Sequence, residues 1–408
     1  MTEEELNEWA EDFENFHARF AHIFGRKEPR QQAQKYMRGL LAPVERKNSW
    51  QLAEAVGDRL PDPTQRLLYQ SHWEADKARD ELEQYVIEVF GEEDGIGVVD
   101  ETGFMKKGQH SVGVKRQYSG TAGKIENSQV GTFLSYATSR GQVLLDRRLY
   151  LPEEWCADPE RRARAKVPAE VVFQTKPEQA REMLEHAWAQ GVPMRWVTGD
   201  EVYGDAPELR AAISASGRWY VLGVRQHTPV WLERPAVDEP GPGEQSRPRT
   251  KARLAVDAPA AIPVVAVVAA WSEPRWQCLT VTEGSKGPRT YDWAYQRVIE
   301  SRDSLPGAEL WLLARRSLTD PTDIAYFLSN APLELGLERL AQVAAARATI
   351  EQCLETAKGE TGLDEYEVRY WHSWHRHITL AMMAQTWLAA VRSRTTAKKG
   401  GLNPSWPS

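Results

Sequence analysis

The chain has 408 residues, of which 41% are apolar and 27% charged, as expected for a globular protein of about two or three domains. Its formal net charge of −7 argues against simple nonspecific affinity for nucleic acid. The three cysteines are widely spaced, which excludes a disulfide framework or a cysteine metal site and is typical of a reduced, cytoplasmic protein.

The start of the chain is acidic and shows no signal sequence, and the longest apolar run, residues 261–271, is too short to span a bilayer. We therefore expect no membrane partner. Positive charge gathers in one later segment, where it predicts either phosphate contact or an ordinary solvated surface. Its basic residues are Lys106, Lys107, Lys115, Arg116, Lys124, Arg147, Arg148, Arg161, Arg162, Arg164 and Lys166.

Residues 1 to about 90 have the pattern of a helical domain. Four phenylalanines recur every three to four residues, which predicts a buried helix face: Phe13, Phe16, Phe20 and Phe24. After a break at residues 26–30, helices are predicted over 31–41, 50–56, 62–70 and 74–90, with Ser49 capping the second of them. The helices over 50–56 and 62–70 suggest a helix-turn-helix-like DNA reader, or alternatively a plain packing module.

Residues 95–225 alternate between strand and helix patterns. Strands are predicted to end at Asp100, to cover 129–137 and 142–150, to end at Asp200, and to cover 218–224, while residues 111–118 are only weakly strand-like. Helices are predicted over 177–190 and 207–216. Three early strands followed by helix, strand, helix and strand are the element order of a ribonuclease-H-like fold.

The pattern changes again from residue 226. Residues 233–249 predict a flexible loop, and residues 262–270, 277–281 and 309–314 are strand-like, so this block indicates a β-rich insertion. Helices are predicted over 320–329, 335–358 and 372–392, and residues 395–408 form a tail. The fold class is therefore α/β, divided into a helical DNA-binding domain (1–92), a core (93–225), the insertion (226–332), the rest of the core (333–394) and the tail (395–408).

Three carboxylates have positions suited to metal binding. Asp100 and Asp200 each end a short apolar run and precede a glycine-bearing turn, a pattern that predicts an acid at the carboxyl edge of a buried strand. Each is also a common turn former when taken alone. Glu351 lies in the helical segment RATIEQCLETAK, residues 347–358, and about 100° per residue places Arg347, Glu351 and Lys358 on one helix face. An ordinary i,i+4 ion pair on a solvated helix is the alternative.

With these residues in view, the chain resembles the DDE transposases of bacterial insertion sequences. It is most similar to the seven-hundred-one-like group of the branch whose third acid lies in a Tyr-x2-Arg-x3-Glu-x6-Lys signature. Arg347, Glu351 and Lys358 match the spacing, whereas Ala344 stands at the tyrosine position. Further matching segments run through most of the chain: RKNSW (46–50), VVDETG (98–103), TGDEVYG (198–204), GLDEYEVRYW (362–371) and WHSWHRHITLAMMA (371–384).

The resemblance implies a ribonuclease-H-like core in which Asp100, Asp200 and Glu351 hold two Mg²⁺ ions, or Mn²⁺ in their place. Asp100 would bridge the ions, while Glu101 and Glu201 are less suitable ligands because neighbours in a strand face opposite ways. The implied reaction is cleavage of transposon ends and transfer of the 3′ hydroxyls to target DNA. The implied partners are double-stranded DNA with terminal inverted repeats, target DNA and a second copy of the chain, near the bacterial nucleoid.

Several further residues are candidates for DNA contact. Arg347 and Lys358 would contact phosphates, and the other candidates are Tyr203, Trp293, Lys106, Lys107 and Arg376. Trp293 would stack on an extruded base, although a buried position in the β-rich block is the alternative. His372, His375 and His377 have a zinc-like spacing, but one helix face cannot hold all three, so phosphate contact or packing is preferred.

Two other functions remain open from the sequence alone. The acidic net charge and Ala344 suggest a transposase-derived protein that binds DNA without cutting it. A ribonuclease-H-like nuclease with another nucleic acid substrate would also use three acids. No Walker-type phosphate loop and no Ser-His-Asp arrangement can be recognised, so ATP use is not indicated.

Overall fold

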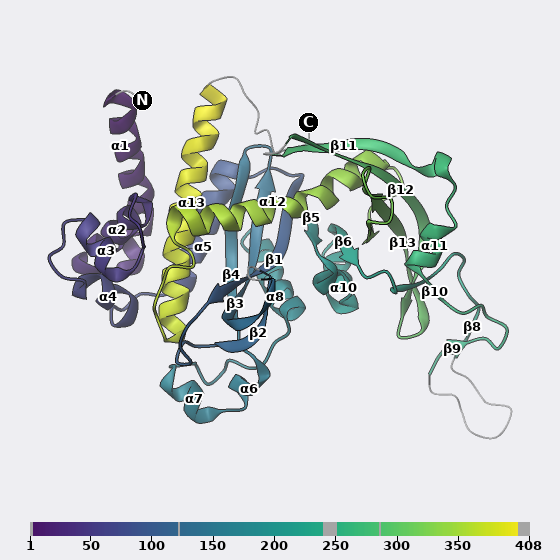
Figure 1. The fold of residues 1–408 in the computed structure, drawn as a ribbon, viewed down its shortest axis with the longest axis horizontal. Coiled ribbons are helices and arrows are strands. Elements are labelled where there is room, and N and C mark those ends of the chain that lie inside the picture. The colour runs from purple at the N-terminus through teal and green to yellow at the C-terminus, as the bar shows by residue number, and fades with distance from the viewer. Residues whose placement is uncertain (1–2, 121–122, 240–250, 285–286, 399–408) are drawn as a thin grey trace. The chain divides into compact units, whose positions relative to one another are not determined.

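The computed structural model of the chain describes residues 3–120, 123–239, 251–284 and 287–398 (Figure 1). It forms two compact units. Unit 1 contains the described residues up to Arg195 and those from Ala348 onward, and unit 2 contains Trp196–Arg347. The five-part division expected from the sequence stays a prediction.

The N-terminal part of unit 1 is helical, and the four phenylalanines of the predicted face are all buried. Helix α2 begins earlier than predicted, at Lys27, because Pro29 lies in its first turn, where a proline is tolerated. The α3 cap is Asn48, one residue before the predicted Ser49. The elements are α1 (Glu3–Arg19), η1 (Phe20–Phe24), α2 (Lys27–Leu41), α3 (Ser49–Ala55), α4 (Asp62–Tyr69) and α5 (Ala75–Phe90).

The sheet of unit 1 is antiparallel and centred on β3, which pairs with β1, β2 and β4. The predicted strands over 129–137 and 142–150 are confirmed, and the weak signal at 111–118 corresponds in part to β2. The elements are β1 (Gly95–Met105), β2 (Lys115–Ser119), β3 (Lys124–Thr138), β4 (Gly141–Tyr150), α6 (Glu153–Cys156), α7 (Pro159–Arg164) and α8 (Lys176–Ala189).

Helix α13 (Trp371–Lys398) is the central element of unit 1. It packs on β4 and on α2, α4 and α5, and α5 also contacts β4 directly (Figure 1). Residues 378 and 380–384, in the middle turns of α13, are fully buried. Apolar and small residues therefore occur on all sides of these turns, because neighbouring elements enclose the helix. The helix confirms the prediction for 372–392 and extends into the predicted tail, of which residues 399–408 lie outside the described residues.

Unit 2 contains a mixed sheet in which β5 and β6 are parallel and β6, β14, β13, β12 and β7 follow as antiparallel neighbours. Strands β7, β12, β13 and β14 lie within residues 226–332, the range of the predicted β-rich insertion, and its status as a separate domain stays a prediction. Its elements, with β5 beginning two residues earlier in unit 1, are β5 (Met194–Gly199), α9 (Glu201–Gly204), α10 (Pro207–Ala215), β6 (Trp219–Val224), β7 (Pro229–Trp231), β8 (Val237–Asp238), β9 (Arg253–Leu254), β10 (Ile262–Pro263), α11 (Val264–Ala269), η2 (Glu273–Arg275), β11 (Gln277–Gly284), β12 (Gly287–Arg302), β13 (Leu305–Arg316) and β14 (Ile324–Ser329). Helix α12 (Leu337–Thr361) begins in unit 2 and continues into unit 1.

Two predictions for this region are wrong. Residues 320–329, predicted as a helix, form a turn and then strand β14. Residues 262–270, predicted as a strand, are mostly helix α11. Of the predicted loop at 233–249, residues 240–249 lie outside the described residues.

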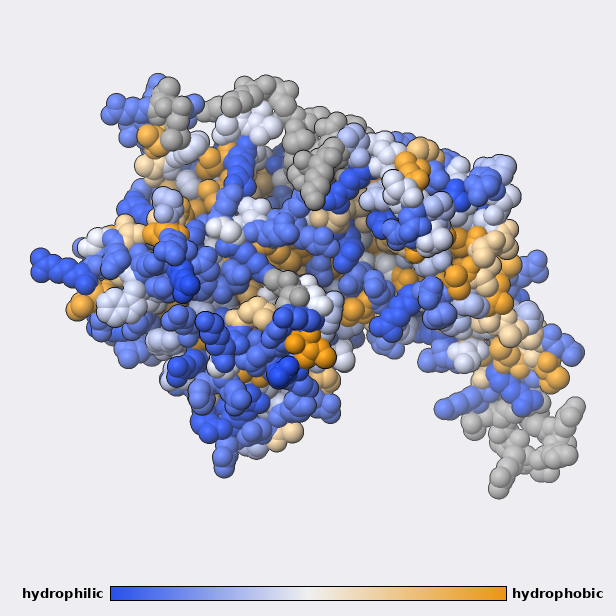
Figure 2. All heavy atoms as spheres, in the orientation of Figure 1, coloured by the Kyte–Doolittle hydropathy of each residue, from blue (hydrophilic) through white to orange (hydrophobic). Residues whose placement is uncertain are grey.

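Both units combine helices and strands, so the predicted α/β class is confirmed at that level. Within the described ranges, no helix is long and apolar enough to cross a membrane. On the face seen in Figure 2, hydrophilic residues dominate over α6 and α7, the part of unit 1 that contains several of the sequence's basic residues.

Candidate active site

Asp100 lies in the middle of β1 and not at its end. The prediction that the strand ends there is wrong, because β1 continues to Met105 and stays paired with β3 throughout. The side chain of Asp100 is nearly buried, and its Oδ1 accepts the N–H of Glu101 at 2.8 Å. This bond fixes the orientation of the carboxylate on the strand.

Glu101 is engaged by a lysine. Its Oε1 lies 2.6 Å from Lys176 Nζ, at the start of α8. Successive strand residues face opposite sides of a sheet, so this pair lies on the face that Asp100 does not use. The lysine partner escaped sequence analysis, because 75 residues separate it from Glu101.

Lys358 connects α12 with β1 inside unit 1. Its Nζ donates to Thr102 Oγ1 at 2.7 Å, and it lies over the ring of Phe104, 5.8 Å from the centroid. Burial lowers the pKa of Lys358. Thr102 is two residues from Asp100 and therefore shares its face of the strand.

Glu351 lies seven residues before Lys358 on the same helix, and seven residues bring a helix almost back to the same face. Its side chain is exposed. The Lys358 side chain thus contacts the strand face that carries Asp100, and Glu351 lies two turns earlier on the same side of α12.

Asp200 belongs to unit 2, where it follows β5 and caps α9. Its Oδ1 accepts the N–H of Val202 at 2.9 Å, and Arg347 Nη2 lies 3.8 Å from its Oδ2. The last residue of the TGDEVYG segment, Gly204, must be a glycine, because a Cβ at this position would lie 1.7 Å from the carbonyl oxygen of Gly223. This close approach of α9 to β6 holds the main chain at Asp200 in place.

The proposed DNA contacts differ in accessibility. Trp293 and Tyr203 are fully buried, and Trp293 packs on Phe327 with ring centroids 5.8 Å apart. In this conformation neither ring offers a face to a base, because protein atoms cover both.

Arg376 and Lys106 both bond to main-chain carbonyl oxygens. Arg376 donates to the carbonyls of Leu68 and Trp73, which links α13 to the N-terminal helices. Lys106 donates to the carbonyl of Tyr366 at 2.9 Å, and burial lowers its pKa to about 8. Lys107, the next residue, is exposed. Among these basic candidates, Lys107 is the best placed to meet a phosphate.

The three late histidines each bond to a main-chain carbonyl. Their partners are Tyr69 for His372, Trp371 for His375 and Gly362 for His377. These carbonyl groups, on α4, on α13 itself and just after α12, fix the orientation of the three rings by packing.

The described residues form a mixed α/β architecture with an acid on β1, another after the parallel strand β5 and a third on α12. The comparisons specify the family. Residues 19–288 match the family described as DDE superfamily endonuclease, and the chain belongs to that family. The match includes Asp100 and Asp200 and ends before Glu351. The assignment of Glu351 as the third acid therefore rests on the spacing of Arg347, Glu351 and Lys358.

One relative is described as a probable transposase for insertion sequence element IS701, from Microchaete diplosiphon. It is 28% identical over 177 residues, which are 43% of this chain and 43% of the relative, so the match spans less than half of either protein. Among solved structures, the NurA nuclease from Sulfolobus solfataricus aligns over 73% of this chain and 94% of its own, at 10% identity and a TM-score of 0.26. At that TM-score no conclusion about the fold or function follows.

Proposed function

We propose that the protein is a metal-dependent DDE transposase that cleaves transposon DNA ends and joins their 3′ hydroxyls to target DNA. The observation that carries the proposal is the contact between Lys358 and Thr102, since Lys358 lies on the side of α12 that carries Glu351 and Thr102 shares the β1 face of Asp100. Membership of the endonuclease family and the partial likeness to an IS701 transposase support the same reaction.

The proposed metal ligands are Asp100, Asp200 and Glu351, and the ions are two Mg²⁺, with Mn²⁺ as a substitute. The donor set fits, because Mg²⁺ takes oxygen ligands, and main-chain N–H groups orient the carboxylates of Asp100 and Asp200. When bound, the ions supply an activated water and stabilise the leaving oxygen. Lys176 neutralises Glu101 and so keeps that carboxylate out of the ligand set.

Arg347 and Lys358 would bind the phosphates on either side of the scissile bond. Arg347 lies one turn before Glu351 on α12, and Lys358 lies two turns after it. The two cations would bind a phosphate with different geometry. A guanidinium can hold two phosphate oxygens at once, whereas an ammonium acts as a point charge. Two DNA ends must be paired before joining, so the active form would be a dimer on DNA.

A cleavage assay tests the proposal. The substrate is a duplex that contains either end of the DNA flanking the coding sequence, and strand cuts are measured with Mg²⁺, with Mn²⁺ and with a chelator. We expect metal-dependent nicking by the native chain, and a loss of at least about 1,000-fold in Asp100→Asn, Asp200→Asn and Glu351→Gln.

The matched control is Glu355→Gln, one turn along α12 from Glu351 and also exposed. It should retain cutting within a few-fold. Full activity in any of the three acid variants would falsify the ligand assignment. Binding of end DNA without nicking would instead support a non-catalytic DNA-binding protein, and preferential cutting of an RNA–DNA hybrid would support another nuclease activity.

A further inference from the structure

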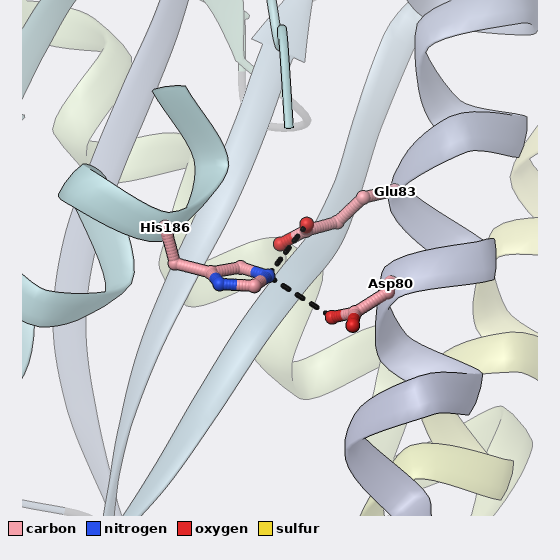
Figure 3. A group of neighbouring side chains, drawn as sticks. All are labelled: Asp80, Glu83 and His186. Atoms are coloured by element: carbon pink, nitrogen blue, oxygen red, sulfur yellow. Dashed lines mark hydrogen bonds and ion pairs between the residues drawn. The ribbon is translucent and has the colours of Figure 1, made fainter. Parts of the chain in front are cut away.

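A second group of metal-binding side chains lies inside unit 1, on elements that carry none of the three proposed catalytic acids. Asp80 and Glu83 come from α5 and His186 from α8, and their ligand atoms all lie within 4.8 Å of one another. Figure 3 shows the two carboxylates and the imidazole pointing toward one another between the helices.

Glu83 is the unusual member of this group. Its side chain is 0% exposed, and neither carboxylate oxygen has a hydrogen-bond partner among the described residues. His186 Nε2 lies 3.2 Å from its Oε2, but that nitrogen already bonds to Asp80 Oδ1 at 3.0 Å. One imidazole N–H serves one acceptor well, so the buried carboxylate is left unsatisfied, which is costly unless a cation or proton compensates it.

The neighbouring arginines do not satisfy Glu83. Arg79, on the same helix, donates through Nη1 to Asp146 at 2.7 Å and through Nε to Asp80 at 2.7 Å. Asp146 also accepts from Arg147 and Arg148. The arginines thus compensate Asp146 and orient Asp80, and burial raises the pKa of Glu83.

The spacing fits a small divalent ion. Two ligands about 2.0–2.1 Å from a tetrahedral ion lie roughly 3.3–3.4 Å apart. The two observed separations, 3.0 Å and 3.2 Å from His186 Nε2 to the carboxylate oxygens, need only a slight opening to reach this value. An imidazole nitrogen with two carboxylate oxygens favours a borderline transition ion over Mg²⁺, which prefers oxygen alone.

We propose that Asp80, Glu83 and His186 form a binding site for Zn²⁺ or a similar divalent transition ion, which ties α5 to α8. The ion replaces the proton shared by the imidazole and the carboxylates, and water completes its coordination. Helix α5 leads directly into β1 and α8 carries the lysine that engages Glu101. The site therefore stabilises the supports of the sheet and takes no part in cleavage.

Zinc uptake by the chelator-stripped chain tests the proposal. The full chain carrying Asp100→Asn, Asp200→Asn and Glu351→Gln removes the catalytic acids as competing ligands. We expect it to retain one zinc per chain after dialysis, measured by elemental analysis, and to lose that zinc when Glu83→Gln or His186→Gln is added. Glu185→Gln, on the exposed side of α8 next to His186, is the matched control and should keep it.

Thermal unfolding with and without zinc separates loss of the site from loss of the fold. The parent is the chain with the three substitutions at the catalytic acids. At a zinc concentration about 100 times its Kd, the unfolding equilibrium constant of this parent should fall about 100-fold, while that of the chain with Glu83→Gln added stays constant. Without zinc, the variant should be at least as stable as its parent, because it lacks the uncompensated carboxylate. The proposal is overturned if the parent binds no zinc, or if both substituted chains retain it.

Discussion

His377 illustrates how a buried titratable side chain couples stability to pH. Its Nε2 lies 3.0 Å from the carbonyl oxygen of Gly362 and its Nδ1 lies 2.8 Å from the hydroxyl of Tyr36. A carbonyl only accepts, so Nε2 carries the proton and Nδ1 accepts from Tyr36. The neutral ring is fully bonded, and burial lowers the pKa of His377 to about 3, from 6.5.

We predict that His377→Gln flattens the loss of stability on acidification. Between pH 6.5 and about 3 the unfolded chain binds a proton that the native ring does not, so this ring alone lowers the unfolding free energy by up to about 1.4 kcal/mol per pH unit as the pH falls. The variant lacks this contribution, although losing the ring should cost about 1–3 kcal/mol at pH 8. Urea unfolding at steps from pH 8 to pH 4 measures both effects.

His22 provides the control, because its ring is largely exposed. His22→Gln should reproduce the native pH dependence. If His377→Gln declines as steeply as the native chain, the acid sensitivity lies in other groups, such as the carboxylates paired with the buried arginines.

At the residue scale, the candidates that can be predicted from the sequence are those whose neighbours in the chain define them. Asp100 and Asp200 were recognised from the apolar strands that precede them, and the four phenylalanines from their spacing. The Lys176–Glu101 pair and the His186 group were not, since Lys176 is 75 residues from Glu101 and His186 is over 100 residues from Asp80 and Glu83. The burial of Trp293 depends likewise on Phe327, which lies on another strand.

The start of α3 shows how a single side chain determines where an element begins. Asn48 accepts the N–H groups of Trp50 and Gln51 through its side-chain oxygen at 3.0 and 3.1 Å. We predict that Asn48→Ala lowers the unfolding free energy by about 1 kcal/mol, because two helix-end donors lose their acceptor. Ser49→Ala, at the position expected from the sequence, should change it by less than about 0.5 kcal/mol. Equal losses in urea unfolding would contradict Asn48 as the cap.

The elements that sequence analysis predicted wrongly have misleading local signals. The Asp-Pro-Thr-Asp segment before β14 resembles a helix start, yet Asp320 Oδ1 accepts the N–H of Thr322 and closes a turn between two strands. Val264–Ala269 is rich in β-branched residues, yet it forms α11 directly after Pro263. In both cases pairing and packing with distant segments override local preference. The longer helices, α5, α8 and α13, were predictable because their patterns persist over several turns.

The contact of α12 with β1 leads to a prediction about catalysis. Lys358→Met keeps the apolar stem of the side chain but removes the ammonium that donates to Thr102. If this charge holds a phosphate beside the proposed acids, the cleavage rate at saturating DNA should fall by about 10-fold or more. Circular dichroism melting checks that the fold survives.

Thr102→Val is the companion variant to Lys358→Met. It removes the hydroxyl that positions the ammonium and keeps the charge, so it should reduce the rate less. A Lys358→Met chain that cuts at the native rate would place the phosphate elsewhere.

In the folded molecule, fewer cations of the predicted basic segment are available to a partner than the sequence suggests. Many cations of the predicted basic segment are engaged within the protein. Lys115 pairs with Glu154, Lys124 pairs with Glu126, and Arg147 is fully buried. The remaining exposed positions in the described part of this segment include Lys107 and Arg164. A sequence gives the number of charges in a segment, but only the fold shows which of them are already neutralised.

Because of this arrangement, binding to DNA should depend on particular exposed cations and not on the net charge of −7. We predict that Arg164→Ala reduces the slope of log K against log salt concentration by about 1, as expected when one phosphate contact is lost. Lys115→Ala removes the same amount of charge from a residue paired with Glu154 and should leave the slope unchanged. Fluorescence anisotropy with a labelled duplex over a salt series measures both slopes. Equal slopes in the two variants would mean that total charge governs the encounter, and the exposed surface at α7 would then have no special part in holding DNA.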